Sequence, residues 1–283
     1  MESFSFSIKM CLVDKYQKCS CLAQMRISKD MNKKFGCFWK CPHCYKKRSI
    51  LFGSIFADSK SPMNITLHMI YCWSMEYSCC LTALECHINP NSVTDLFFLI
   101  RNACFQNIFA ENIQRIGGPG TTIEVDETLF SKRKYNQGSL LHEQWIFGGI
   151  CRETGDFFAY LVPDRKSETL FKIIEDNILP GTRIISDQFV SYHIIDSQPH
   201  PQAYYHETVN HSKNFVDPIS GAHTQKIERL WRELKRTKHR YYGVARNHTD
   251  LHLAEFLWRY RNIKDKSQSF NKTIELLKET KFQ

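Results

Sequence analysis

Apolar and polar positions divide the chain into three regions with different patterns. Residues 1–62 are basic and rich in cysteine, and residues 63–116 carry apolar side chains at helical spacing. The sequence Ile116-Gly-Gly-Pro-Gly120 interrupts this pattern, and the residues after it alternate as strands do. We therefore expect a small N-terminal segment over 1–62, a helical region over 63–116 and a further domain over 117–283.

The middle region predicts helices separated by a short break. Its first apolar segment runs from Ile65 to Cys86 and is followed by the breaker Asn89-Pro90-Asn91. Ser92 then predicts the N-cap of a helix that continues through Ile108. Two helices joined in this way are compatible with a DNA-reading helix-turn-helix or with a plain helical hairpin.

The third region predicts strands and helices in the order of an α/β domain. Three consecutive strands precede a helix and a fourth strand, and two more helices follow an irregular stretch that ends near Gly221. This is the element order of a ribonuclease-H-like domain, in which helices flank a mixed sheet. The expected strands are Thr122–Phe130, Trp145–Cys151, Phe157–Val162 and Arg183–Ser186, and the expected helices are Ser167–Ile178, His223–Lys238 and Asp250–Asn262.

Two aspartates stand at informative places in the predicted strands. Alternation puts Glu124, Asp126 and Thr128 on one face of the first strand, away from its apolar neighbours. Asp187 follows the fourth strand, at the end where open α/β sheets bind ligands. Either aspartate alone would more often be a cap or turn residue, so the pair gains weight only from a third acid.

The helix predicted from His223 supplies a third acid. Ile227, Leu230, Trp231 and Leu234 form a buried stripe at helical spacing, and Glu228 lies beside it. A surface glutamate paired with Arg232 is the simpler interpretation of this helix alone. Three carboxylates from different elements could instead hold two Mg²⁺ or Mn²⁺ ions, because hard cations prefer oxygen ligands and paired ions activate phosphodiester cleavage.

Charge and membrane patterns narrow the partners. The net charge is +9, and the basic residues are concentrated in two regions. Residues 1–63 hold 12 Lys and Arg against 4 Asp and Glu, and residues 223–249 hold 8 Lys and Arg against 2 Asp and Glu. Such regions predict a polyanionic partner such as nucleic acid, although a basic face can also be merely solvated. The first residues do not resemble a signal peptide and no apolar run reaches membrane-spanning length, so we expect an intracellular protein without a membrane partner.

Cysteines are concentrated in the N-terminal half, and four of them have a spacing typical of zinc sites. Cys19-x-Cys21 and Cys41-x-x-Cys44 could bind one Zn²⁺, although the first pair is one residue shorter than usual. Cys37 and His43 are alternative ligands. Cys72, Cys79, Cys80 and Cys86 are expected to pack as small apolar residues in a helix.

The chain resembles the Merlin group of DDE transposases in an ordered series of short motifs. They include Ile123-Glu-Val-Asp-Glu-Thr128, Trp145-Ile-Phe-Gly-Gly149, Ser186-Asp187, Val209-Asn-His-Ser212, Phe215-Val-Asp-Pro218, Gly221-Ala-His-Thr-Gln225, Ile227-Glu228, Trp231 and Lys235. The resemblance implies a ribonuclease-H-like fold, a zinc-ribbon-like start and a catalytic triad of Asp126, Asp187 and Glu228 that uses Mg²⁺.

The same resemblance implies roles around the triad. The enzyme would cut DNA at transposon terminal inverted repeats and join the freed 3′-hydroxyl to target DNA, as a homo-oligomer on DNA and in the nucleus if the host is eukaryotic. A transposase-derived DNA-binding protein without cleavage activity and a ribonuclease-H-type nuclease are the alternatives. The expected DNA contacts are Lys132, Arg133, Lys134, Arg232, Lys235 and Arg236, although the first three could equally form a solvated loop. The expected supporting residues are His211, His223 and Thr224, and a structural hydrogen bond is the simpler role for the two histidines.

Overall fold

The chain divides by its contacts into two compact units. The computed structural model describes residues 10, 12, 16–30, 37–57, 61–109, 115–131, 143–197, 204–210, 223–240 and 246–280. One unit comprises Met1–Ile108 with Asn262–Gln283, and the other comprises Phe109–Arg261. The C-terminal end therefore groups with the N-terminal helices, whereas the sequence predicted one domain over 117–283. No described helix combines the length and the apolar character that a membrane crossing needs.

A small antiparallel sheet forms the N-terminal part of the first unit. Strands β1 (Arg26–Lys29), β2 (Cys37–Lys40) and β3 (Lys47–Arg48) pair in the order β1-β2-β3. Trp39 on β2 is almost completely buried. The sequence did not predict these strands, because they are short and carry many Lys and Arg side chains.

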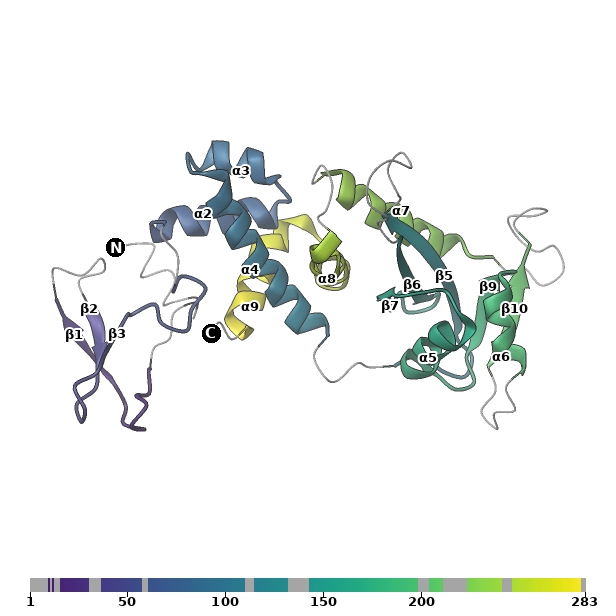
Figure 1. Ribbon diagram of the computed structural model, residues 1–283, viewed down its shortest axis with the longest axis horizontal. Helices are drawn as coiled ribbons and strands as arrows, with labels where there is room; N and C mark the ends of the chain where they lie inside the picture. Colours follow the sequence, from purple (N-terminus) through teal and green to yellow (C-terminus); the bar gives the residue numbers. More distant parts are fainter. Residues whose placement is uncertain are drawn as a thin grey trace. The chain divides into compact units, whose positions relative to one another are not determined.

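Helices form the rest of the first unit (Figure 1). They are α2 (Met63–Ser74), α3 (Cys79–Glu85), α4 (Pro90–Ile108) and α9 (Ser269–Glu279). Helix α9 packs against α2 and α4, and the Phe270 ring meets Tyr71 edge-on at 5.8 Å between centroids. This packing explains why the end of the chain groups with the helical region.

Two details of the predicted helices were wrong. The single apolar segment from Ile65 to Cys86 breaks after Ser74, and Ser78 begins α3 by accepting a hydrogen bond from the Leu81 N–H at 3.2 Å. Helix α4 begins at Pro90, so Ser92 is not its N-cap. The Asn89 side chain accepts from the Asn91 N–H at 2.8 Å instead, as proline is well tolerated in a first turn.

The second unit is built on a five-stranded mixed sheet. Its strands are β5 (Thr122–Ser131), β6 (Gln144–Cys151), β7 (Phe157–Val162), β9 (Arg183–Asp187) and β10 (Tyr205–Val209), in the order β10-β9-β5-β6-β7. Strands β5, β6 and β7 are antiparallel neighbours, while β9 runs parallel to both β5 and β10. The ribonuclease-H-like α/β fold is therefore confirmed, and β10 is a strand in the stretch that the sequence predicted to be irregular.

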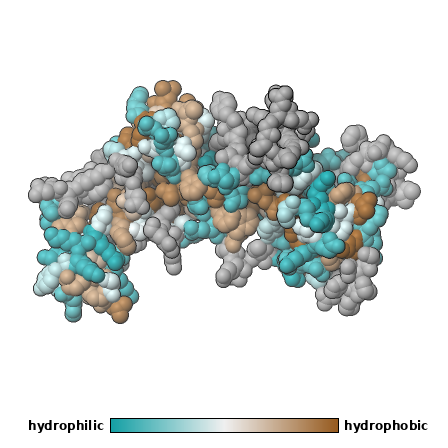
Figure 2. All heavy atoms as spheres, viewed as in Figure 1, coloured by the Kyte–Doolittle hydropathy of each residue, from teal (hydrophilic) through white to brown (hydrophobic). Residues whose placement is uncertain are grey.

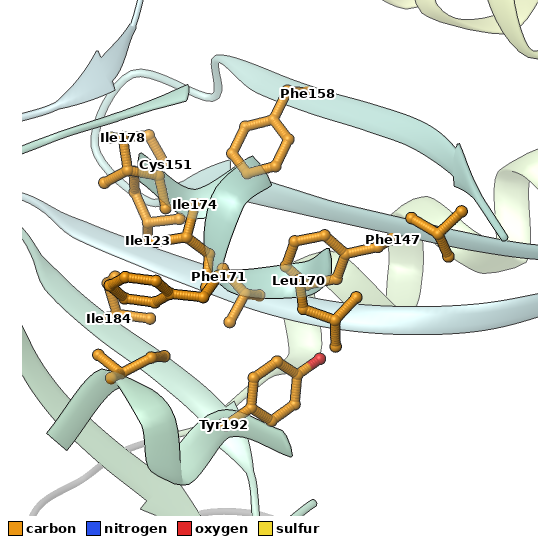
Figure 3. Packing of buried hydrophobic residues seen from close by; sticks show 13 residues of the cluster. Ile123, Phe147, Cys151, Phe158, Leu170, Phe171, Ile174, Ile178, Ile184 and Tyr192 are labelled. Carbon is orange, nitrogen blue, oxygen red and sulfur yellow. The ribbon is translucent and has the colours of Figure 1, made fainter. Parts of the chain in front are cut away.

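Helices cover both faces of this sheet (Figure 1). The core cluster on one face joins residues of β5, β6 and β7 to Leu170 and Ile174 of α5 (Ser167–Asn177) and to Ile195 of α6 (His193–Ser197) (Figure 3). On the other face, α7 (Gln225–Arg240) contacts β5 and β6. Helix α8 (Thr249–Asn262) follows at the β7 edge, where Arg261 donates to the Phe157 carbonyl at 2.8 Å.

Short elements complete the described part of the second unit. Strand β4 (Ile116–Gly117) pairs in parallel with β8 (Ile178–Leu179), next to the Thr182 hydroxyl that accepts from the Gly118 N–H at 2.8 Å. The 3-10 helix η1 (Val190–Tyr192) leads from β9 into α6. Glycine is required at position 117, where φ is +91° and a Cβ atom would stand 2.6 Å from Thr182 Oγ1.

Candidate active site

Asp126 and Asp187 leave neighbouring strands on the same face of the sheet. In the parallel pairing of β5 and β9, Glu124 lies opposite Ile185. Asp126 and Asp187 each stand two residues further along, and side chains two positions apart share a face of a strand. The two aspartates therefore face the side of the sheet that α7 covers, as the alternation on β5 predicted.

The Asp126 carboxylate lies in an unfavourable electrostatic environment. Burial, together with the negative charges of Glu127 and Asp187, raises the pKa of Asp126 to about 8. The Trp231 indole N–H compensates only in part, by donating to Asp126 Oδ2 at 3.1 Å. Asp187 accepts a hydrogen bond from the Phe189 backbone N–H at 2.9 Å. A cation between these carboxylates would relieve their repulsion.

Helix α7 positions Glu228 beside the sheet. Ile227, Leu230, Trp231 and Leu234 are all buried, which confirms the predicted stripe. Glu228 lies one turn before Trp231, which makes the contact to Asp126, and its Oε1 accepts from the Thr224 hydroxyl at 3.1 Å. The third acid thus lies one helical turn from the point where α7 meets the first acid.

Glu124 has a role that the sequence did not reveal. It shares the Asp126 face, as predicted, but it is 0% exposed and is bound to the start of α7. Its Oε2 accepts from the backbone N–H groups of Lys226 at 2.8 Å and Ile227 at 3.0 Å, and its Oε1 accepts from Arg152 Nε at 2.7 Å. A carboxylate at a helix N-terminus satisfies free N–H groups and complements the helix dipole. Glu124 therefore fixes the end of α7 from which Glu228 projects.

His223 and Arg152 belong to the same connection. Arg152 donates to the His223 carbonyl oxygen as well as to Glu124, and His223 Nδ1 lies 3.4 Å from Glu124 Oε1. Burial, with the positive charge of Arg152, lowers the pKa of His223. His223 is thus placed at the start of α7 beside Glu124.

The neighbouring acid Glu127 points to the opposite face and is held there. The Tyr192 hydroxyl donates to Glu127 Oε2 at 2.5 Å, and Arg165 pairs with Oε1 at 3.3 Å. Tyr192 belongs to the core cluster, with its hydroxyl at the cluster boundary (Figure 3). The Arg165 guanidinium lies over the Trp145 ring at 3.8 Å from the ring centroid. These contacts hold the β5 backbone next to Asp126 from the opposite face of the sheet.

Gly148 allows α7 to approach the sheet beside Asp126. It pairs with Asp126 in the β5–β6 register. A Cβ atom at position 148 would stand 2.9 Å from Trp231 Cη2 and would also collide with the Phe158 carbonyl oxygen. The indole that contacts Asp126 therefore occupies the space left by an absent side chain.

Four cysteines converge in the N-terminal sheet region. The Sγ atoms of Cys19 and Cys44 are 3.3 Å apart, and those of Cys21 and Cys41 are 3.5 Å apart. All four sulfur atoms lie within 4.8 Å of one another, so they are close enough to share one metal ion, and the alternatives Cys37 and His43 are not part of this set. The backbone N–H of Cys21 and the neighbouring Cys44 lower the pKa of Cys19 to about 6, which favours the thiolate that metals bind.

The predicted site residues differ in how closely the structure gathers them. Within the described ranges, the sets of three or more His, Cys, Asp or Glu ligands that lie mutually within 4.8 Å are the four-cysteine set and a set of His68, Cys72 and Cys86. The three acids face one region without reaching that distance. Arg232, Lys235 and Arg236 are exposed on α7, whereas Lys132, Arg133, Lys134 and His211 lie outside the described residues.

The residues that form this sheet and carry the three acids match a known protein family. Residues 115–261 match the ISXO2-like transposase domain. The chain belongs to this transposase family. A relative from Haemophilus influenzae, described as an uncharacterized transposase-like protein, is 30% identical over 111 residues, which are 39% of this chain and 85% of the relative. The ISXO2-like domain thus contains Asp126, Asp187 and Glu228 together with the whole five-stranded sheet.

Two solved structures are similar to this ISXO2-like chain at low sequence identity. The catalytic core domain of BIV integrase is 18% identical with a TM-score of 0.34, covering 51% of this chain and 84% of that chain. The HTLV-2 integrase catalytic core domain in complex with magnesium is 14% identical with a TM-score of 0.31, covering 52% of this chain and 88% of that chain.

Proposed function

We propose that the protein is an active DDE transposase of the Merlin type. It would cleave DNA strands at transposon terminal inverted repeats and transfer the freed 3′-hydroxyl ends into target DNA. One observation carries this proposal: in a transposase-family domain, Asp126 and Asp187 leave adjacent strands on the face covered by the helix that holds Glu228. Each of these acids therefore comes from a different element.

The donor set fits a pair of Mg²⁺ or Mn²⁺ ions held by Asp126, Asp187 and Glu228. Hard divalent cations prefer carboxylate oxygens, and such cations would relieve the burial and the neighbouring negative charges that raise the pKa of Asp126 to about 8. When bound, two ions supply activation of the attacking oxygen and stabilisation of the leaving oxygen. The chain's own contribution is to orient these acids, through Trp231 at Asp126 and Thr224 at Glu228.

Cations on the exposed side of α7 would hold the DNA backbone near these acids. Arg232 and Lys235 follow Glu228 by one and two helical turns, and Arg236 lies beside them. Lys and Arg neutralise phosphates and release counterions, so binding should weaken steeply with added salt. DNA contact by Lys132, Arg133 and Lys134 and orientation of the substrate or a metal-bound water by His211 stay predictions.

The N-terminal cysteines complete the proposed enzyme. A Zn²⁺ ion bound by Cys19, Cys21, Cys41 and Cys44 would stabilise the small β1–β3 sheet, which contributes further basic residues for DNA. Because the proposed reaction joins two DNA molecules, we expect several copies of the chain to assemble on DNA. The reaction would take place where the genome is, which in a eukaryote is the nucleus.

Replacement of each acid tests the proposal directly. With DNA carrying the inverted repeats that flank the reading frame, Asp126→Asn, Asp187→Asn and Glu228→Gln should each reduce Mg²⁺-dependent cleavage at least about 1000-fold, roughly 4 kcal/mol of transition-state stabilisation. DNA binding should persist. Glu233→Gln is the matched control, because Glu233 lies on the same helix but pairs with exposed Arg229 at 3.4 Å.

The alternatives predict different results in the same assay. A transposase-derived binding protein would bind the repeats without Mg²⁺-dependent cleavage by the unmodified chain. A ribonuclease-H-type nuclease would cleave RNA–DNA hybrids and leave DNA ends unjoined. Full activity in any one acid variant would remove that residue from the site.

A further inference from the structure

A second cluster of metal-binding side chains lies in the helical region. His68 and Cys72 are four residues apart on α2 and therefore share one face of the helix. Cys86 is the C-cap of α3 and reaches the same place. The ligand atoms of the three residues all lie within 4.8 Å of one another. Cys72 and Cys86 are buried, whereas His68 is exposed, so the cluster lies at the edge of the helical core.

We propose that His68, Cys72 and Cys86 bind a zinc-class divalent cation that joins α2 to α3. In a tetrahedral site with sulfur about 2.3 Å from zinc, two sulfur ligands stand about 3.8 Å apart. The ligand atoms of His68, Cys72 and Cys86 lie at most 4.8 Å apart, so each pair exceeds this spacing by no more than about 1 Å. Thiolate and imidazole ligands select zinc over magnesium, so this site would not compete with the acids of the sheet for Mg²⁺.

The surroundings of the cluster suit a positive ion. Glu85 directly precedes Cys86 at the end of α3, and the negative charge of its carboxylate acts on both thiols. Three protein ligands leave a fourth tetrahedral position, which a water molecule would occupy on the exposed side of the cluster. Cys80 lies on the same short helix α3 but is exposed and outside the cluster. The cluster therefore contains only some of the cysteines of α2 and α3.

The ion would add a link at the corner between α2 and α3, where α3 packs mainly against α4. Helix α3 is only 7 residues long, and it follows the break between Ser74 and Cys79. Helices this short are not stable by themselves. Its outer side carries Leu84, which is 71% exposed, and Figure 2 shows apolar residues at the surface in this region. A metal bridge between α2 and the end of α3 would therefore maintain the position of the whole corner.

Metal stoichiometry of the full-length chain tests this proposal. After loading with Zn²⁺ and dialysis under reducing conditions, the unmodified protein should retain one zinc ion at each of its two clusters. His68→Ala should lower the zinc content by one ion per chain, and Cys86→Ala should do the same. His68 is exposed, so its replacement leaves the core intact, and Cys80→Ala is the matched control that should retain the full content.

A Cys41→Ser background separates the two clusters. There the chain should still bind one Zn²⁺, which His68→Ala should remove, and Co²⁺ in its place should give a thiolate-to-metal absorption band. Zinc content that is unchanged by His68→Ala in the unmodified background would overturn the proposal. So would a Cys72–Cys86 disulfide, seen by mass spectrometry as a loss of two hydrogens without bound metal.

Discussion

The four-cysteine cluster and the three acids, two proposed metal sites, differ in how the protein arranges their ligands. The cysteine sulfur atoms are already gathered within 4.8 Å of one another, and the cysteines lie just outside the strands of the small β1–β3 sheet. The acids are instead spread over β5, β9 and α7, and protein N–H and O–H groups bind each of them. A structural site is closed by protein ligands, while a site that works on a substrate must keep positions open. The difference predicts that the two metals contribute to different properties.

Removal of zinc should have the largest effect on folding. A chelator that prefers zinc should unfold the β1–β3 sheet, because structural zinc contributes on the order of 10 kcal/mol to such small domains. Hydrogen exchange should then accelerate in residues 37–57 and stay slow in Thr122–Ser131 of β5. Removal of Mg²⁺ alone should stop DNA cleavage and leave hydrogen exchange slow in both segments. Equal protection of residues 37–57 with and without zinc would show that the sheet needs no metal.

Glu124→Gln should have the next largest effect, because it weakens the link between the sheet and α7. Breaking a buried, hydrogen-bonded ion pair costs about 3 kcal/mol, since the Arg152 partner is left uncompensated. Urea unfolding should show this loss, and kcat should fall more than DNA affinity because Glu228 would be less well positioned. The control Glu207→Gln removes a half-exposed pair with Arg183 and should cost less than about 1 kcal/mol. Equal losses in both variants would contradict the capping role.

Asp126→Asn should abolish cleavage and yet stabilise the metal-free protein. The pKa of Asp126 is about 8 in the folded chain against an ordinary value of 3.8, so the folded state holds the proton more tightly. The stability that comes with this proton is complete below pH 4 and is lost as the pH rises toward 8. The variant and the unmodified chain should therefore melt alike near pH 4, and the advantage of the variant should grow as the pH rises, to at least about 5 °C at pH 8.5.

The effect of Mg²⁺ on the melting temperature shows whether Asp126→Asn stabilises the protein by removing charge repulsion or by another effect of the asparagine side chain. If the carboxylates repel one another, Mg²⁺ should raise the melting temperature of the unmodified chain at pH 8.5 and leave Asp126→Asn nearly unchanged. A difference between the two proteins that is the same at every pH would contradict the raised pKa.

Tyr192→Phe should have the smallest effect. It removes the hydroxyl that donates to Glu127 at 2.5 Å and leaves the ring in the core. The free energy of unfolding should fall by about 1 kcal/mol, measured in urea. The control Tyr205→Phe changes a residue that is 69% exposed and should have no measurable effect. A loss as large as that of Glu124→Gln would mean that both faces of β5 matter equally.

The sequence predicted the parts of the fold that depend on local pattern. Alternation on β5 gave the face of Asp126, and helical spacing gave the buried stripe of α7. Strand β10 was missed because its sequence Tyr-His-Glu-Thr-Val is mostly polar and it is stabilised by pairing with β9, a distant segment. The β1–β3 sheet was missed because converging cysteines, rather than an apolar pattern, mark its position.

The site was predicted less completely than the fold. Glu124 shares its face with Asp126, and only the position of the α7 N-terminus shows that it caps a helix. The set of His68, Cys72 and Cys86 depends on the bend between α2 and α3, which the continuous apolar segment concealed. In both cases the information lies in contacts between elements that spacing along the chain does not encode.

The absence of a side chain at Gly148 limits how this transposase-family domain can vary. A methyl group there would push the Trp231 indole outward, and the helix that carries Glu228 would shift with it. Alanine at this position would therefore disturb reaction geometry while adding no charge and removing no ligand. Screens for inactive transposases that inspect only acidic positions would overlook such a chain.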